Sequence, residues 1–239
     1  MQSGLYVAIS AQVALQKRLD TIADNVANAN TVGFRSTEVK FEDVVSALGD
    51  RKVAFVSPGS TYLSSKAGGF TQTGNPLDFA VRGEAWFGIE TPVGTVMTRD
   101  GRFTMRETGD LVTLEGYAVL DAGGAAIQLN PQEGPPEASA DGMLRQNGQP
   151  IAAIGLFAFT PGENFTRFGN SGLIPTTPPE PVVDQIDVGV VQGFVEQSNV
   201  NPVLEMTQLI MVQRSFENAT ALIKASDRTM GEAVKALGS

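Results

Sequence analysis

Proline is confined to the middle of this chain. All thirteen prolines lie between Pro58 and Pro202, and none occurs in residues 1–57 or 203–239. Proline removes a backbone donor and breaks helix interiors, so the two proline-free ends are suited to long uninterrupted helices. Glycine-rich stretches between the prolines favour turns. The distribution therefore predicts a helix, a β-rich domain and a second helix, in that order.

The spacing of apolar residues supports a helix at each end. Both ends repeat at alternating intervals of three and four residues, which is typical of one face of a helix. The positions are Leu5, Ala8, Gln12, Leu15, Leu19, Ile22 and Val26 at the N-terminal end, and Met206, Leu209, Gln213, Phe216, Thr220, Ile223, Asp227, Met230, Val234 and Leu237 at the C-terminal end. Asn201-Pro202 is a good start signal for the second helix, with Asn as the cap and Pro at the first helical position.

These helices would be about 40 and 50 Å long at 1.5 Å per residue. Each apolar face also contains polar residues, so the two helices alone would make a poor core. We expect a coiled-coil-like pair that packs against the helices of other subunits. The alternative is a helical pair that covers the β domain of a monomer.

The middle of the chain is typical of an antiparallel sandwich or barrel, because strand-sized runs recur at intervals of about ten residues. Asp100-Gly101 is suited to a type I′ hairpin turn, and further turns are expected at Gly109-Asp110 and Glu115-Gly116. We expect a loop over residues 130–150, followed by one strand in "IAAIGLFAF". The predicted fold class is α+β.

The same patterns divide the chain into four segments. Residues 1–35 are expected to hold the N-terminal helix, 36–75 an extended connector, 76–198 a central β-rich domain, and 199–239 the C-terminal helix. Charge follows this division, since residues 36–198 contain ten basic and twenty acidic residues, whereas the two ends are near neutral. Near-neutral ends suit segments that pack closely against copies of themselves.

Composition excludes several classes of chemistry. The chain has no cysteine and no histidine, which removes disulfides, thiol nucleophiles, histidine bases and nearly all zinc sites. A net charge of −9 disfavours nucleic acid as a partner. No apolar run approaches the ~18–20 residues that span a bilayer, and no cleavable signal peptide is visible.

Paired carboxylates are the remaining catalytic option. The candidates in the β region are Asp78, Glu84, Glu90, Asp100 and Asp110. Solvated strand faces and Asx turns account for most of them without catalysis. No calcium-loop or phosphate-binding glycine pattern occurs, and the Trp86-Phe87 pair is interpreted as core packing. We therefore expect no enzyme activity, no cofactor, no metal and no small-molecule substrate.

The stretch "ADNVANANTVGF", residues 23–34, places three asparagines where the first helix must end. Asn28 and Asn30 can occupy a left-handed conformation or cap free carbonyls. Gly33 is expected to have a positive φ at a sharp turn. Asn25, one turn earlier, can reach neighbouring backbone where helices pack tightly.

Three motifs in order make the chain resemble the rod and hook family of bacterial flagellar axial proteins. They are "TIADNVANANTVGFR", "TGNPLDFAVRGEAWFGIETPVGTVMTRDGRFTMRETGDLVTLEGYAVLD" and "GFVEQSNVNPVLEMTQLIMVQRSFENATALIKASD". Val26 stands where the family usually has leucine. The chain length and the opening "MQSGLYVAIS" are most similar to proximal-rod subunits, and distal-rod subunits are the alternative.

The resemblance implies a structural subunit that assembles helically with its own copies and with other rod proteins into the periplasmic drive shaft of the basal body. It also implies export by the flagellar type III apparatus without signal cleavage, terminal helices in the inner tube with the β domain outside, and contact with the rings around the rod. A ligand-binding β domain with incidental helices is the rival interpretation. The expected assembly residues are Leu5, Leu15, Leu19, Ile22, Asn25, Val26, Asn28, Asn30, Gly33, Phe34, Met206, Leu209, Gln213, Phe216, Ile223, Met230 and Val234.

Overall fold

A computed structural model describes residues 2–48, 51–57, 59–183 and 185–237. Side chains are described over these ranges except at 2–5, 43–48, 51–56, 226–227, 230, 233–234 and 236–237. The chain forms two compact units. The helical unit contains Met1–Ala27, Thr37–Tyr62 and Asn201–Ser239, and the β unit contains Asn28–Ser36 and Leu63–Val200.

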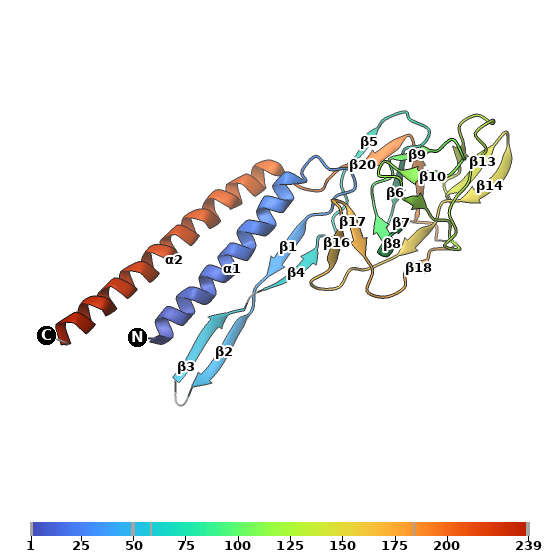
Figure 1. Cartoon of the computed structure of the whole chain (residues 1–239). Helices are drawn as coiled ribbons and strands as arrows, with labels where there is room; N and C mark the ends of the chain where they lie inside the picture. The colour runs from blue at the N-terminus through green and yellow to red at the C-terminus, as the bar shows by residue number, and fades with distance from the viewer. Residues whose placement is uncertain (1, 49–50, 58, 184, 238–239) are drawn as a thin grey trace. The chain divides into compact units, whose positions relative to one another are not determined.

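The helical unit contains α1 (Gln2–Ala27) and α2 (Pro202–Leu237), which confirms a long helix at each end of the chain. The two helices lie side by side, with both termini at the same end of the pair (Figure 1). No helix formed by the described residues is long and apolar enough to cross a membrane.

The face that α2 buries within its own chain is offset from the predicted stripe. Its buried and half-buried positions are Glu205, Gln208, Leu209, Val212, Phe216, Ala219, Thr220 and Ile223. Met206 and Gln213, which the sequence pattern placed on the stripe, are exposed. Thr220 lies on the covered side, where its hydroxyl accepts a hydrogen bond of 3.3 Å from the Gln12 amide of α1.

The start of α2 is confirmed. The Asn201 side-chain oxygen accepts hydrogen bonds from the backbone N–H groups of Val203 and Leu204, each at 3.2 Å. These are two of the donors that the first turn of a helix leaves without intrahelical partners. Pro202 occupies the first helical position, where its missing N–H costs nothing.

The stretch expected as an extended connector also contributes strands to the helical unit. β1 (Thr37–Lys40) pairs with β4 (Ser60–Leu63), and β2 (Asp43–Leu48) pairs with β3 (Arg51–Val56) in an antiparallel hairpin. The Lys17 ammonium of α1 donates to the Gly59 carbonyl at 2.6 Å and ties this region to the first helix.

The β unit is built from antiparallel pairs (Figure 1). Its large sheet has the order β16 (Thr166–Phe168), β17 (Gly172–Ile174), β8 (Gly94–Thr98), β7 (Trp86–Thr91), β11 (Ala118–Val119), β10 (Leu111–Thr113) and β9 (Phe103–Met105). β15 (Leu156–Ala158) pairs with both β7 and β18 (Glu180–Pro181).

The smaller sheets are β12 (Glu137–Ala138) with β13 (Met143–Gln146) and β14 (Gln149–Ala153), β19 (Gly189–Gln192) with β6 (Phe79–Arg82), and β20 (Phe194–Glu196) with β5 (Phe70–Gln72). Together with the two helices, these antiparallel sheets establish an α+β fold.

The core of the β unit lies on both faces of β7. Phe87 belongs to the larger apolar cluster, where its ring lies 5.2 Å from that of Phe103. Its neighbour Trp86 points to the opposite face and joins a second cluster with Met97 and Phe157. Both aromatic residues are buried, which confirms that the pair is core packing.

The predicted Asp100-Gly101 hairpin turn is wrong. β8 pairs with β7 and β17, while β9 pairs with β10, so the two strands on either side of this dipeptide do not form a hairpin. Gly101 does not have a positive φ. It is small because the carbonyl of Phe79 lies where a Cβ would stand.

Two other predictions about the β region also fail. Residues 130–150 are not all loop, because β13 and β14 form a hairpin around Asn147-Gly148. Both turn residues have positive φ, 49° and 77°, as a type I′ turn requires. "IAAIGLFAF" is two strands rather than one, since β14 pairs with β13 and β15 pairs with β7 and β18.

Candidate functional site

Segments from the three sequence motifs meet inside the β unit. We call this place the junction and define it as Gly33–Ser36, Ser64–Gly68, Arg99 and Glu196–Asn199. Arg35, Arg99 and Glu196 are each no more than 2% exposed. The junction is therefore a buried group of charged side chains in the interior of the β unit.

Glu196 binds both arginines through its carboxylate. One oxygen lies 2.9 Å from Nη2 of Arg35, and the other lies 3.0 Å from Nη1 of Arg99. The first oxygen also accepts the backbone N–H of Gly68 at 3.1 Å. One negative charge thus serves two positive charges, and a buried cation without a partner would be strongly destabilising.

The arginines also donate from their Nη atoms to backbone carbonyls, whereas the buried Nε of each has no hydrogen-bond partner among the described residues. Arg35 Nη1 donates to the carbonyls of Ser65 at 3.0 Å and Lys66 at 2.7 Å. Arg99 donates to the carbonyls of Val81 at 3.2 Å and Gly83 at 2.8 Å. A planar guanidinium is suited to this task because it presents five donors in a fixed geometry. Burial lowers the pKa of Arg99, and the Glu196 carboxylate opposes that shift.

Backbone hydrogen bonds also fix the turn around Gly33 within the junction. We call residues 31–36, which form this turn, the corner segment. The Gly33 N–H donates to the Glu196 carbonyl at 2.7 Å, and the Ser36 N–H donates to the Asn199 side-chain oxygen at 2.7 Å. The Ser64 N–H in turn donates to the Ser36 carbonyl at 2.9 Å. The Asn199 amide donates to the Lys66 carbonyl at 2.8 Å. These bonds satisfy several buried backbone groups of a segment that has no regular structure.

Gly33 has a φ of 69°, which confirms the expected positive value. A Cβ at this position would overlap the backbone of Arg99 and Asp100. The turn therefore needs glycine for two reasons: the left-handed conformation and the close approach of another segment. The next residue, Phe34, is fully buried beneath the Arg167 guanidinium, which lies 4.3 Å from the ring centroid.

The three asparagines have three different environments. In the helical unit, Asn25 is buried and exchanges two 2.9 Å hydrogen bonds with the backbone of Thr37, one as donor and one as acceptor. In the β unit, the Asn28 side-chain oxygen accepts the Thr31 hydroxyl at 3.1 Å. Asn30 is exposed. Neither Asn28 nor Asn30 has a positive φ, so of the two alternatives offered for them the left-handed conformation is wrong.

The carboxyl group of Glu205, in the helical unit, has a raised pKa. Partial burial raises its pKa, and the nearby Glu38 carboxylate raises it further. A hydrogen bond with the Asn25 side chain and the charge of Arg18 act in the opposite direction. Asn25 thus connects the last turn of α1, the start of β1 and the first turns of α2.

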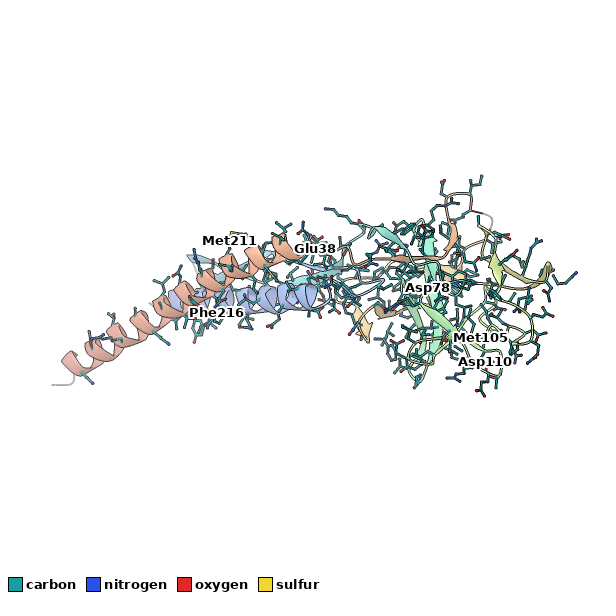
Figure 2. The ribbon with its side chains drawn as sticks, turned by 90° about the horizontal axis from the view of Figure 1, so that it is seen from above. Glu38, Asp78, Met105, Asp110, Met211 and Phe216 are labelled. Atoms are coloured by element: carbon teal, nitrogen blue, oxygen red, sulfur yellow. The ribbon has the colours of Figure 1, made fainter. Side chains whose placement is uncertain are left out.

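The remaining predicted assembly residues lie on the helices. Ile22 is buried, and Leu15, Leu19, Val26, Leu209, Phe216 and Ile223 are half-buried. Met206 and Gln213 are exposed. The side chains of Leu5, Met230 and Val234 fall outside the described residues. Of the two α2 residues labelled in Figure 2, Phe216 is half-buried while Met211 is 56% exposed.

The five candidate carboxylates do not all lie at one place, although Asp78 and Asp100 are both near Arg102. Figure 2 shows Asp78 and Asp110 well apart. Each is bonded locally, Asp78 by the Asn75 amide at 3.0 Å and Asp110 by the Thr108 hydroxyl at 2.6 Å. Asp100 binds the guanidinium of Arg102. Over the described ranges, no group of three or more acidic side chains is placed to hold a metal ion.

The sequence motifs contained Arg35, Arg99 and Glu196 but gave no reason to single them out. A charged residue in a polar stretch normally indicates a solvated position. Glu196 is separated by 97 residues from Arg99, so no helical or strand periodicity links them. Their only local signal was position: Arg35 and Arg99 stand next to predicted turns, and Glu196 stands shortly before the predicted start of the second helix.

Three family models match this chain. The model described as "Flagella basal body rod protein" matches residues 5–35, "Flagellar hook protein FlgE/F/G D1 domain" matches 80–149, and "Flagellar basal body rod FlgEFG protein C-terminal" matches 191–236. None of the three describes a catalytic domain.

Curated proteins match over the full length. A flagellar basal-body rod protein FlgF from Mesorhizobium japonicum is 65% identical over 239 residues, covering 100% of this chain and 99% of that protein. A FlgF from Rhizobium meliloti is 55% identical, with 100% and 99% covered. A FlgG from Bacillus subtilis is 31% identical, with 98% of each covered.

We predict that Glu196→Gln destabilises the β unit by about 3–5 kcal/mol, because it leaves two buried guanidinium groups without a counter-ion. Trp86 is the only tryptophan of the chain and lies in the β unit, so its fluorescence reports denaturant unfolding there. The control is Glu107→Gln at an exposed position, where a change within about 0.5 kcal/mol is expected. Equal losses in the two variants would contradict the prediction.

We also predict that Gly33→Ala costs about 2 kcal/mol more than Gly74→Ala. Both glycines have positive φ, 69° and 74°, so both variants carry the same left-handed strain. At Gly74 nothing lies within 4 Å of the point that a Cβ would occupy, whereas at Gly33 that point meets backbone. The comparison uses Trp86 fluorescence in denaturant, and similar midpoints would show that the backbone contact is unimportant.

A third prediction concerns pH. Because the folded pKa of Glu205 is raised above its ordinary value of 4.5, the folded state holds the proton more tightly. This contribution to stability is present at low pH and is lost as pH rises through the folded pKa. Glu205→Gln should therefore stabilise the helical unit relative to the native chain increasingly as pH rises above 4.5. Thermal melts followed by helical circular dichroism measure this difference, which should not grow if the shift is absent.

Proposed function

We propose that this chain, which belongs to the flagellar basal-body rod protein family, is a self-assembling subunit of the proximal rod. Its full-length relatives are structural rod proteins, and the relatives at 65% and 55% identity carry the name FlgF. The resemblance to FlgG, at 31% identity, makes a distal-rod subunit the alternative. The chain is a structural axial component of the flagellum, and we infer that it has no catalytic role.

The observation that carries self-assembly is the apolar surface that the helical unit leaves uncovered. On α1, Tyr6, Ile9 and Val13 are 60%, 41% and 53% exposed and follow one helical face. On α2, the exposed apolar residues are Val203, Leu204, Met206, Ile210, Met211 and Leu222. Contiguous exposed apolar surface of this kind marks an interaction site. In a helical axial assembly, the α1 and α2 helices of neighbouring copies would cover this apolar surface.

The helices have two apolar sides in this proposal. One side, which includes Phe216 and Ile22, forms the coiled-coil-like contact between α1 and α2 of one chain. The other side, which includes Met206 and Ile210, contacts the helices of neighbouring subunits. Close packing of many helices gives torsional stiffness because a well-packed interior is poorly compressible. Such stiffness is what a drive shaft needs.

The junction has a supporting role in the same proposal. Phe34 and Gly33 are buried within the chain itself, so they act by fixing the corner segment and do not contact neighbours directly. Asn25 acts similarly in the helical unit, through Thr37. We also propose the four-segment division of the chain, with 76–198 as the outer domain.

The remaining parts of the proposal concern place and partners. We infer export through the flagellar type III apparatus without a cleaved signal peptide, and assembly in the periplasmic span of the rod. The partners are copies of the chain, other rod proteins and the rings around the rod. A near-neutral charge on the helical ends supports close packing among them.

We predict that Ile210→Glu abolishes assembly and leaves the monomer folded. Ile210 is 54% exposed, so the variant removes little packing within the chain but places a charge in the proposed contact. The measurement is swimming of a strain that carries only this variant, together with the circular dichroism of the purified chain. Phe216→Ala should also impair swimming. Truncating a fully buried phenylalanine costs about 3–5 kcal/mol of packing energy, and the cost per subunit should be smaller here because Phe216 is half-buried.

The control is Gln132→Glu, which adds the same charge at an exposed polar position of the β unit, outside the helices. It should leave swimming largely intact. Free swimming of the Ile210→Glu strain would show that this face is not an assembly contact.

A further inference from the structure

Methionine supplies all the sulfur of this chain, because the sequence has seven methionines and no cysteine. Five of them have described side chains. Met97 is fully buried in the β unit, and Met105 and Met143 are half-buried there. Met206 and Met211, both on α2, are 51% and 56% exposed. Among the described side chains, the two thioethers of α2 are therefore the most open to solvent.

Both of these methionines belong to the apolar surface that the helical unit leaves uncovered. Met206 lies three residues after Val203 and four before Ile210, and these spacings place side chains on one helical face. Val203 and Ile210 are 74% and 54% exposed. Met211, labelled on α2 in Figure 2, follows directly after Ile210. The two sulfur atoms therefore lie in the surface that we propose to contact neighbouring subunits.

The fold of the single chain does not depend on these two side chains. The positions of α2 that are buried or half-buried within the chain include Leu209, Val212 and Phe216, and neither Met206 nor Met211 is among them. A chemical change at either sulfur should therefore leave the monomer folded. Its effect should appear only when the exposed face of α2 is covered.

Oxidation converts this apolar surface into a polar one. Hydrogen peroxide transfers one oxygen atom to a thioether: its O–O bond breaks, an S–O bond forms, the sulfur is oxidised by two electrons and the peroxide is reduced to water. The thioether is apolar and adaptable, whereas the sulfoxide is polar and chiral. A polar group that loses its water in an apolar contact, without a hydrogen-bond partner, is unfavourable there.

We propose that Met206 and Met211 are sites at which peroxide oxidises the unassembled subunit, and that their sulfoxides prevent assembly. The second half rests on the proposed function, because it requires this face of α2 to contact neighbouring subunits. Assembly in turn covers both sulfur atoms and shields them from peroxide. An oxidised subunit is thus excluded before it enters the rod, whereas a subunit already in place is resistant.

The first test measures initial rates of oxidation in the purified full chain, with hydrogen peroxide as the oxidant and peptide mass spectrometry as the readout. We expect Met206 and Met211 to react at least about tenfold faster than the fully buried Met97. Helical circular dichroism should stay unchanged while the two sites react. Equal initial rates at the three methionines would contradict the assignment of these sites.

The same measurement on isolated basal bodies tests protection by assembly. Met206 and Met211 should react there at least about tenfold more slowly than in the purified chain, because neighbouring helices cover them. Unchanged rates at both positions would show that assembly does not shield these sulfur atoms.

The last test measures the swimming of strains whose only copy of the chain is altered at both positions. Glutamine stands in for the sulfoxide, because it is unbranched, uncharged and polar. Leucine is the matched control, because it is apolar, similar in volume and cannot be oxidised. We expect loss of swimming with Met206→Gln and Met211→Gln together, and near-native swimming with Met206→Leu and Met211→Leu together.

The Ile210→Glu strain separates failure of this inference from failure of the proposed function. Free swimming of the glutamine strain, with loss of swimming in the Ile210→Glu strain, would refute the block by sulfoxide and leave the assembly face in place. Free swimming of both strains would remove the assembly face itself. Loss of swimming in the leucine strain would also overturn the inference, since the positions would then require methionine and not merely an apolar side chain.

Discussion

The contact on which the β unit depends is the carboxylate of Glu196 between two buried guanidinium groups. Removing three charges from water is expensive, and the mutual attraction offsets that cost only when the geometry is good and the other donors are bonded. Here Nη donors of Arg35 and Arg99 bond four backbone carbonyls: those of Ser65, Lys66 and Gly83 on irregular segments and that of Val81 in β6. The charged group thus helps to bury backbone that lies outside regular secondary structure.

This explains why polar residues of the family motifs lie inside the protein. An apolar replacement could fill the same volume, yet it could not bond the carbonyls of Ser65 and Lys66. The corner at Gly33 needs such support, because its backbone runs directly against Arg99 and Asp100. Asn25 solves a similar problem in the helical unit, where its side chain bonds the Thr37 backbone as another strand would.

The sequence predicted features that depend on neighbours along the chain. Two proline-free ends, the Asn201 cap and the positive φ of Gly33 follow from local backbone chemistry, and all three are confirmed. Features that depend on distant contacts were missed. Asp100-Gly101 has the composition of a hairpin turn, but glycine is needed there because a Cβ would overlap the Phe79 carbonyl. Arg99 and Glu196 are far apart in sequence, and the face of α2 that meets α1 was offset because Met206 and Gln213 fit the same spacing as the covered residues.

The unequal lengths of the two helices have a mechanical consequence. α2 has 36 residues and α1 has 26, so α2 is longer by roughly 15 Å at 1.5 Å per residue. From Lys224 onward, every described side chain of α2 is exposed. If subunits stack along the helix axis in the assembly that we propose, this overhang would overlap the next layer. A twisting load between layers would then pass through helix backbone as well as through side-chain contacts.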